Sequence, residues 1–234
     1  MTFDVDFFIK TFFVCLKAVP VALEITAVTL MISLPVGFCF AFLRIKSGFA
    51  INGLITAYIS LVRGTPIVVQ ILVLYSMLPS ILASLLKGIN SPINVYDVDP
   101  IYYAYVIFSL NTTAILSEVF RSALSTVPKG QLEAAESAGL TTFQAYRRII
   151  IPQAMVTAVP NICTATINLI KATSLAFLMT VKEITAVAKI EAAYGYNYIE
   201  AYLDIWIIYF LVCIIVERMF KMLETRLKIY KSAA

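Results

Sequence analysis

The chain has 234 residues, of which 61% are hydrophobic and 14% are charged, with a formal net charge of +4. A soluble domain carries about 25% charged residues, so this composition argues against a soluble enzyme or a nucleic-acid-binding module. It predicts an all-α protein whose main solvent is the lipid bilayer. The sequence contains no histidine, which removes the commonest general base and metal ligand.

Residues 1–18 form the first predicted segment, in which phenylalanines alternate with charged residues such as Lys10 and Lys17. We expect this amphipathic segment to lie at the membrane surface rather than to cross the membrane. Acidic residues, including Asp6, stand where a signal peptide carries its basic region, so the first membrane segment is predicted to be retained. The first span follows at about 19–43 and has the ~20 apolar residues needed to cross the hydrocarbon core.

The next apolar run is too long for one simple crossing and is interrupted between Arg63 and Pro66. Proline removes a backbone donor, and an arginine is costly at bilayer depth. We therefore predict an interfacial approach at 51–62 and the second span at about 65–86. A polar loop rich in turn residues follows at 87–100.

The third span is predicted at about 101–121 and ends with Glu118 and Arg121, which are three residues apart on one helical face. This pair is either part of a gate or a structural ion pair at the membrane boundary. Asn111, within the same span, either lines a cavity or donates a hydrogen bond to a neighbouring helix.

Residues 122–152 form a polar connection between apolar blocks. Pro128 favours a helix start, and Gly139 favours a helix end with the positive φ that a Cβ resists. Thr141, three residues before a glutamine, predicts a capping box at the start of a second helix. We expect Pro152 to interrupt that helix, which gives two short helices hinged at Gly139.

The fourth span is predicted at about 153–180 and the fifth at about 203–220, with a basic tail at 223–234. Five spans place the two termini on opposite sides of the membrane. Twelve basic residues fall on one side: Arg44, Lys46, Arg63, Arg121, Lys129, Arg147, Arg148, Arg218, Lys221, Arg226, Lys228 and Lys231. Five fall on the other: Lys10, Lys17, Lys87, Lys182 and Lys189. The positive-inside rule then places the N-terminus outside, and the 122–152 segment and the C-terminus inside.

Lys171 lies about two-thirds along the fourth span, where a charge is costly unless it faces water, protein or a ligand. One interpretation places its ammonium on a transport route, where it would meet a substrate carboxylate while Thr173 and Ser174 supply hydroxyl groups. The other is that Lys171 extends to the membrane surface in a structural role.

We find no catalytic constellation and no metal-ligand cluster in the sequence. The four cysteines, Cys15, Cys39, Cys163 and Cys213, lie in apolar stretches without CxxC spacing. They are therefore interpreted as small buried hydrophobic residues rather than as disulfide or metal ligands. A Walker-type phosphate loop is also missing, so the chain is not expected to be an ATPase itself.

The 122–152 segment resembles the E-A-A…G…I-x-L-P motif of ABC importer permeases. The matching residues are Glu133, Ala134, Ala135, Gly139, Ile149, Ile151 and Pro152. Ile151 stands where the motif usually has leucine, which conserves volume. In that family the segment is a cytoplasmic coupling loop that seats in a cleft of the ATPase subunit.

Two further stretches, Arg63–Gln70 and Lys171–Phe177, resemble permeases for polar amino acids, and the resemblance extends over about residues 20–220. Asp99-Pro100, Tyr146–Gln153 and Lys171–Phe177 are most similar to cystine importer permeases. Permeases for glutamine, glutamate and arginine share most of the same features.

This resemblance implies a type I ABC importer permease fold in the bacterial plasma membrane. It implies a second permease subunit, identical or different, two ABC ATPase subunits that carry ATP and Mg²⁺, and an extracellular solute-binding protein. It also implies that the chain holds no cofactor of its own.

Two other classes remain open from the sequence. An ion-coupled secondary transporter usually shows internal repeats with interrupted helices in corresponding places, and we see no such repeat. A membrane scaffold without transport activity is the third class. Copurification of an ATPase distinguishes the first class from the other two.

Overall fold

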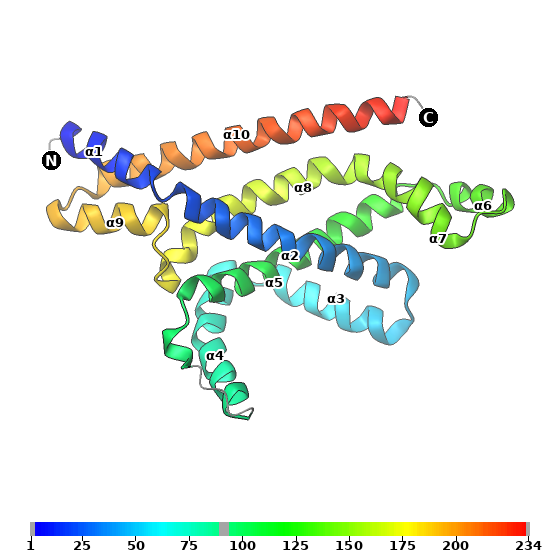
Figure 1. Ribbon diagram of the computed structural model, residues 1–234, viewed down its shortest axis with the longest axis horizontal. Coiled ribbons are helices and arrows are strands. Elements are labelled where there is room, and N and C mark those ends of the chain that lie inside the picture. The colour runs from blue at the N-terminus through cyan, green and yellow to red at the C-terminus, as the bar shows by residue number, and fades with distance from the viewer. Residues whose placement is uncertain (1–2, 89–93, 233–234) are drawn as a thin grey trace.

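The computed structural model describes residues 3–88 and 94–232 (Figure 1). Every regular element in these ranges is a helix. In chain order they are α1 (Val5–Leu16), α2 (Val19–Lys46), α3 (Phe49–Arg63), α4 (Ile67–Gly88), the 3-10 turn η1 (Val95–Asp97), α5 (Pro100–Ser125), α6 (Lys129–Ser137), α7 (Thr142–Ala145), the π-helical turn η2 (Tyr146–Ile150), α8 (Ile151–Thr173), the 3-10 turn η3 (Ser174–Met179), α9 (Ile184–Gly195) and α10 (Tyr198–Ser232). Residues 89–93, part of the polar loop predicted at 87–100, lie outside the described residues.

Among the described residues, five helical stretches are long and apolar enough to cross a membrane, which confirms the predicted all-α architecture with five spans. They are Val5–Lys46, Ile67–Gly88, Pro100–Ser125, Thr142–Met179 and Tyr198–Arg226. The 15-residue helix α3 precedes the second of them, and the chain breaks between the two helices at the predicted place. Gly64 caps α3 by donating its N–H to the carbonyl of Ser60 at 2.9 Å.

The long helices α2, α5, α8 and α10 run along the length of the molecule (Figure 1). The N-terminus, α1 and α9 lie at one end, whereas α6, α7 and the C-terminal end of α10 lie at the other. The connection between α5 and α8 therefore lies at the same end as the basic C-terminal region.

The helices α2 and α5 pack closely at the centre of the molecule. A Cβ added to Gly37 would lie 3.1 Å from Cβ of Leu116 and 3.2 Å from the backbone nitrogen of Ser117. A nearby Ser33 hydroxyl donates to the Ser109 carbonyl at 3.0 Å. Small residues and interhelical hydrogen bonds of this kind bring helices together in lipid, where apolar burial drives association only weakly.

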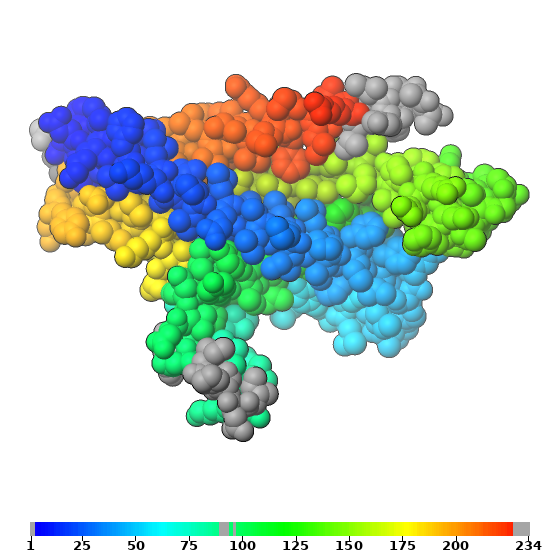
Figure 2. Space-filling model, in the orientation of Figure 1, coloured from blue at the N-terminus to red at the C-terminus, as the bar shows by residue number. Residues whose placement is uncertain are grey.

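The helix α4 has a different environment, because it runs across the long helices and projects from the body (Figures 1 and 2). Ile71 is buried, whereas Leu72, Met77 and Leu85 are exposed. A helix with so many exposed apolar side chains is expected to contact lipid or another protein chain.

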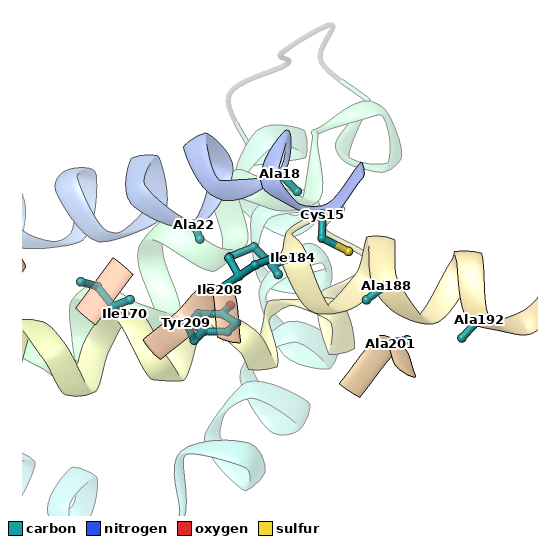
Figure 3. Close-up of a cluster of buried hydrophobic side chains, with 10 residues drawn as sticks. All are labelled: Cys15, Ala18, Ala22, Ile170, Ile184, Ala188, Ala192, Ala201, Ile208 and Tyr209. Atoms are coloured by element: carbon teal, nitrogen blue, oxygen red, sulfur yellow. The ribbon is translucent and has the colours of Figure 1, made fainter. Parts of the chain in front are cut away.

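The cysteines are free, but they do not share one environment. Cys15 of α1 is fully buried in a cluster with residues of α9 and α10, among them Ala188 and Ala201 (Figure 3). The expectation that all four cysteines are buried is wrong for Cys39, which is exposed on α2, and Cys163 and Cys213 are half-buried. An apolar side chain in a membrane helix can face lipid, so its hydrophobicity alone does not predict burial within the protein.

Candidate functional site

The first candidate site is the connection between α5 and α8. Pro128 is the residue before α6, and this helix ends in a reversal at Gly139, whose φ is +86°. The Leu140 N–H donates to the Ala135 carbonyl at 3.1 Å across this reversal, an arrangement typical of glycine-terminated helices. The predicted left-handed conformation of Gly139 is confirmed.

The second limb of the connection begins with the predicted capping box, which is also confirmed. The Gln144 N–H donates to the Thr141 hydroxyl at 3.3 Å, and the Thr141 N–H donates to the Gln144 side-chain oxygen at 2.9 Å. The Thr142 hydroxyl donates to the Glu136 carboxylate at 2.9 Å. This last bond joins the two limbs on either side of Gly139.

The expectation that Pro152 interrupts the second helix is wrong. The helix passes through the π-helical turn Tyr146–Ile150 and continues directly into α8, in which Pro152 lies at the first turn. A wider π turn breaks the regular hydrogen-bond pattern, and helices are often adapted in this way at functional sites. Since proline lacks an N–H, Pro152 fits where the pattern changes.

The motif residues differ in what they present to a partner. Glu133 and Ala134 are exposed, whereas Ala135 is 4% exposed and packs inside the chain. Phe143, on the other limb, is 72% exposed. An exposed aromatic side chain beside charged groups is typical of an anchor residue in a protein–protein interface.

The end of α2 contacts this connection. The Tyr146 ring packs edge-to-face against Phe42 at 5.4 Å between centroids, and the Lys46 ammonium lies 4.9 Å from the same ring. A groove of about 380 Å³ opens beside these residues, and Glu133 and Ile150 also line it. Movement of the connection would therefore reach α2 as well as α5 and α8.

Glu118 forms an ion pair with Arg121, as the sequence predicts, and a second one with Arg44. The Arg44 guanidinium donates to one Glu118 oxygen at 2.7 Å. Arg121 donates from two nitrogens to the other oxygen, with its Nε at 3.1 Å, and this Nε also lies 3.2 Å from the first oxygen. The side chains of Arg44 and Glu118 are 14% and 26% exposed. This triad joins α2 to α5 near the end that bears the connection.

The second candidate site is a pocket of about 590 Å³ between α8 and α10, which falls within the usual size range for small-molecule sites. Lys171 and Ser174 line it from the α8 side, and Glu217 and Tyr209 line it from α10. Thr173 lies behind the wall, where its buried hydroxyl donates to the Ile170 carbonyl at 2.7 Å.

Asn111 lies apart from this pocket. Its side-chain nitrogen donates to the Gln70 side-chain oxygen at 3.0 Å and so joins α5 to α4. Gln70 in turn donates to the Val62 carbonyl at 2.7 Å and to the Thr65 hydroxyl at 2.9 Å, across the break between α3 and α4. Asn111 thus supports the position of α4.

Several residues of these sites were missed from the sequence, among them Arg44, Phe143, Tyr209 and Glu217. Arg44 entered the charge count, but its partner is 74 residues away, and no local spacing reveals such a pair. Phe143 gave a usable signal, because a lone phenylalanine stood in a polar connection. Glu217 gave no signal, because it stands beside the basic residues Arg218 and Lys221 at the end of the last span.

A family comparison identifies residues 33–229 as matching the family described as "Binding-protein-dependent transport system inner membrane component". The matched range includes both candidate sites.

Two relatives from Bacillus subtilis (strain 168) are similar over most of their length. The L-cystine transport system permease protein TcyL is 35% identical over 209 residues, which cover 89% of this chain and 85% of the relative. The probable amino-acid permease protein YxeN is 36% identical over 214 residues, which cover 92% and 91%.

A solved structure described as an amino acid ABC transporter with histidines has a chain of the same fold. The two chains superpose with a TM-score of 0.81 at 26% sequence identity, over 97% of this chain and 100% of the other.

Proposed function

Because this chain belongs to the family of binding-protein-dependent transport system inner membrane components, and is the permease subunit of an amino-acid ABC importer in the bacterial plasma membrane, we propose two finer assignments. The first is that it carries L-cystine. The second is that the connection between α5 and α8 couples transport to a cytoplasmic ATPase.

The pocket between α8 and α10 is the observation that carries the substrate assignment. Lys171 lines it with a cation, which suits the carboxylate of a bound amino acid. Glu217, which also pairs with Lys221 at 2.9 Å, lines it with an anion that suits the ammonium group. The Ser174 hydroxyl adds a neutral hydrogen-bonding group, while Thr173 supports the wall from behind. The similarity to TcyL favours cystine among the amino acids, and glutamine, glutamate and arginine are the alternatives.

The coupling assignment follows from the exposed groups of the connection. Glu133 and Ala134 face outward beside the reversal at Gly139, and Phe143 projects from the second limb. A carboxylate suits a basic partner surface, and an exposed aromatic ring suits an apolar pocket. The buried Ala135 and the continuous helix through Pro152 would carry the movement of this surface into α8.

The assembly proposed around this chain contains a second permease subunit, identical or different, two ABC ATPase subunits and an extracellular solute-binding protein. ATP and Mg²⁺ would bind the ATPase subunits, and this chain would hydrolyse no ATP. Five spans cannot readily enclose a route alone, and the projecting α4 offers apolar surface to a neighbour. Copurification with an ATPase tests this composition.

Substitution of Gly139 tests the coupling assignment. Gly139→Val should keep the permease in the membrane but abolish substrate-stimulated ATP hydrolysis and uptake, because a β-branched residue at positive φ costs about 1–3 kcal/mol and displaces the reversal. Gly130→Val is the matched control, since both glycines have open space around a Cβ and only Gly139 has a positive φ. Wild-type uptake by an assembled Gly139→Val transporter contradicts the assignment.

Uptake of labelled amino acids tests the substrate assignment. Lys171→Met should weaken the apparent affinity for cystine roughly tenfold to a hundredfold, the effect of losing one charge-assisted contact of about 1.5–3 kcal/mol. Lys182→Met, which removes an exposed lysine outside the pocket, is the control. Unchanged kinetics would return Lys171 to a structural role. Uptake of glutamine, glutamate or arginine in place of cystine would select the alternative substrate.

A further inference from the structure

The short link between η3 and α9 contains Glu183, a fully buried acidic residue that no assigned role explains. Its side chain has 0% exposure. One oxygen accepts from the Ala186 N–H at 3.0 Å, and the other accepts from the Thr185 N–H at 2.8 Å. These two bonds cap the N-terminus of α9, as an acidic residue commonly does.

Glu183 accepts a third hydrogen bond, which is not part of the helix cap. The Tyr209 hydroxyl of α10 donates to the same Glu183 oxygen that accepts from Thr185, at 2.9 Å. The Thr173 hydroxyl at the end of α8 lies 3.4 Å from the Tyr209 oxygen. All three side chains are buried, and together they connect α8, α9 and α10.

Tyr209 belongs to both this network and the pocket. It lines the pocket between α8 and α10 together with Lys171 and Ser174, while its hydroxyl is bonded to Glu183. Any shift of Glu183 must therefore move the hydroxyl of a pocket residue or break its bond. Breaking the bond would leave a buried carboxylate without one of its partners, which is costly.

The helix α9 depends on this network for its position. It follows a turn at Thr180, whose φ is +61°, so the direction of the chain changes sharply after η3. It then packs against α1 and α10 through a cluster that includes Cys15, Ile184 and Ala188 (Figure 3). The cluster on the α9 side is built largely of alanines, which hold the helix with little apolar area per residue.

We infer that Glu183 is a positioning residue for transport: it fixes α9 against α10 and, through Tyr209, fixes the wall of the pocket, so that docking of α9 and substrate affinity change together. The part that concerns affinity rests on the proposed function of the pocket as the substrate site. The part that concerns α9 rests on the hydrogen bonds and burial alone.

The native thiol of Cys15 reports on the docking of α9, because it is fully buried in the cluster that α1 forms with α9 and α10. The experiment uses the assembled transporter with Cys39, Cys163 and Cys213 replaced by alanine, and N-ethylmaleimide as the probe. Glu183→Ala should raise the labelling rate of Cys15 at least tenfold, because it removes all three side-chain hydrogen bonds at the start of α9. Tyr194→Ala, which truncates an 84%-exposed side chain on the same helix, should leave the rate within about twofold.

Uptake kinetics of the same assemblies test the connection to the pocket. Glu183→Ala should raise the KM for labelled cystine at least tenfold, and Tyr209→Phe should raise it by a smaller factor because only the hydroxyl is lost. Glu183→Gln should recover part of the affinity, since its amide oxygen still accepts from the α9 backbone. A purely structural role would instead reduce the amount of assembled transporter, and with it Vmax, at constant KM.

The results separate this inference from the proposed function. The inference is overturned if the labelling rate of Cys15 does not change in Glu183→Ala. It is also overturned if Lys171→Met raises the KM but an assembled Glu183→Ala or Tyr209→Phe transporter leaves the KM unchanged. If Glu183→Ala does not assemble, Tyr209→Phe decides by the same criterion. Absence of uptake of any labelled amino acid by the unsubstituted assembly contradicts the proposed function, while Cys15 labelling still decides whether Glu183 holds α9.

Discussion

Burial sets the protonation behaviour of Glu183, which lies outside the membrane-spanning segments. Loss of solvent disfavours its charged form and raises the pKa of the carboxyl group from 4.5 to about 7, although the donors from Thr185, Ala186 and Tyr209 lower it. Other titratable groups packed around this region are Cys15 of α1, Glu191 of α9 and Asp204 of α10. Glu183 therefore titrates close to physiological pH.

Glu183 should make the stability of the protein depend on pH. Because its pKa is higher in the folded state, the folded protein binds the proton more tightly, and this contribution is complete below about pH 4.5 and is lost as the pH rises through about 7. We expect the difference between the thermal midpoint of the wild type and that of Glu183→Gln to decrease as the pH rises from about 4.5 to about 7. Above about pH 7 the difference should stay constant. Parallel melting curves of the two detergent-solubilised proteins measure the difference, and a constant difference across that range contradicts this prediction.

The sequence reveals single residues when their partners are local. The Glu118–Arg121 pair, the capping box at Thr141 and the positive φ at Gly139 each follow from a spacing of a few residues, and all three are present. Glu183 could not be found in this way, because its partner Tyr209 is 26 residues away on another helix. The apolar pattern also gave no reason to expect an acid at 0% exposure.

At the scale of helices, the five long apolar stretches could be predicted because their length must match the bilayer. The π-helical turn Tyr146–Ile150 could not, because no residue type specifies it and the proline two residues later suggested a helix end. The position of α4 could not be predicted from the sequence either, since it depends on the Asn111–Gln70 hydrogen bond and on surfaces outside this chain.

The contact between α2 and α5 should depend on Glu118. Glu118→Gln keeps the size of the side chain but removes the counter-charge of Arg44, which is mostly buried. We expect a loss of stability on the order of 1–2 kcal/mol, less than for a fully buried pair because Glu118 and Arg121 retain some solvent. Chemical or thermal unfolding of the solubilised subunit measures it.

Lys221→Met is the control for this substitution, since it breaks the exposed pair between Lys221 and Glu217 on one helix. Exposed pairs contribute little because solvent screens them, so no measurable change is expected. Equal effects of the two substitutions would show that the Arg44–Glu118–Arg121 triad does not hold the helices together.

For the whole molecule, the distribution of basic residues and the number of spans predict one orientation in the membrane. The N-terminus lies at the end opposite to α6, α7 and the C-terminal end of α10 (Figure 1), as five crossings require. The exposed arginines Arg147 and Arg148 lie at the end with the connection, and Lys182 lies at the other, before α9. The positive-inside rule then predicts that the connection between α5 and α8 faces the cytoplasm, where ATP is available.

Cysteine labelling in intact cells tests this orientation. In a background without the four native cysteines, a cysteine at Asp97, between α4 and α5, should react with a membrane-impermeant maleimide, because this exposed position lies on the predicted outer side. A cysteine at Gly130, which is exposed in α6 and has open space around a Cβ, should react only after the cells are permeabilised. Both positions are accessible to solvent, so a difference between them reports the side of the membrane rather than burial. Labelling of Gly130→Cys in intact cells together with protection of Asp97→Cys would reverse the orientation and place the connection out of reach of an ATPase.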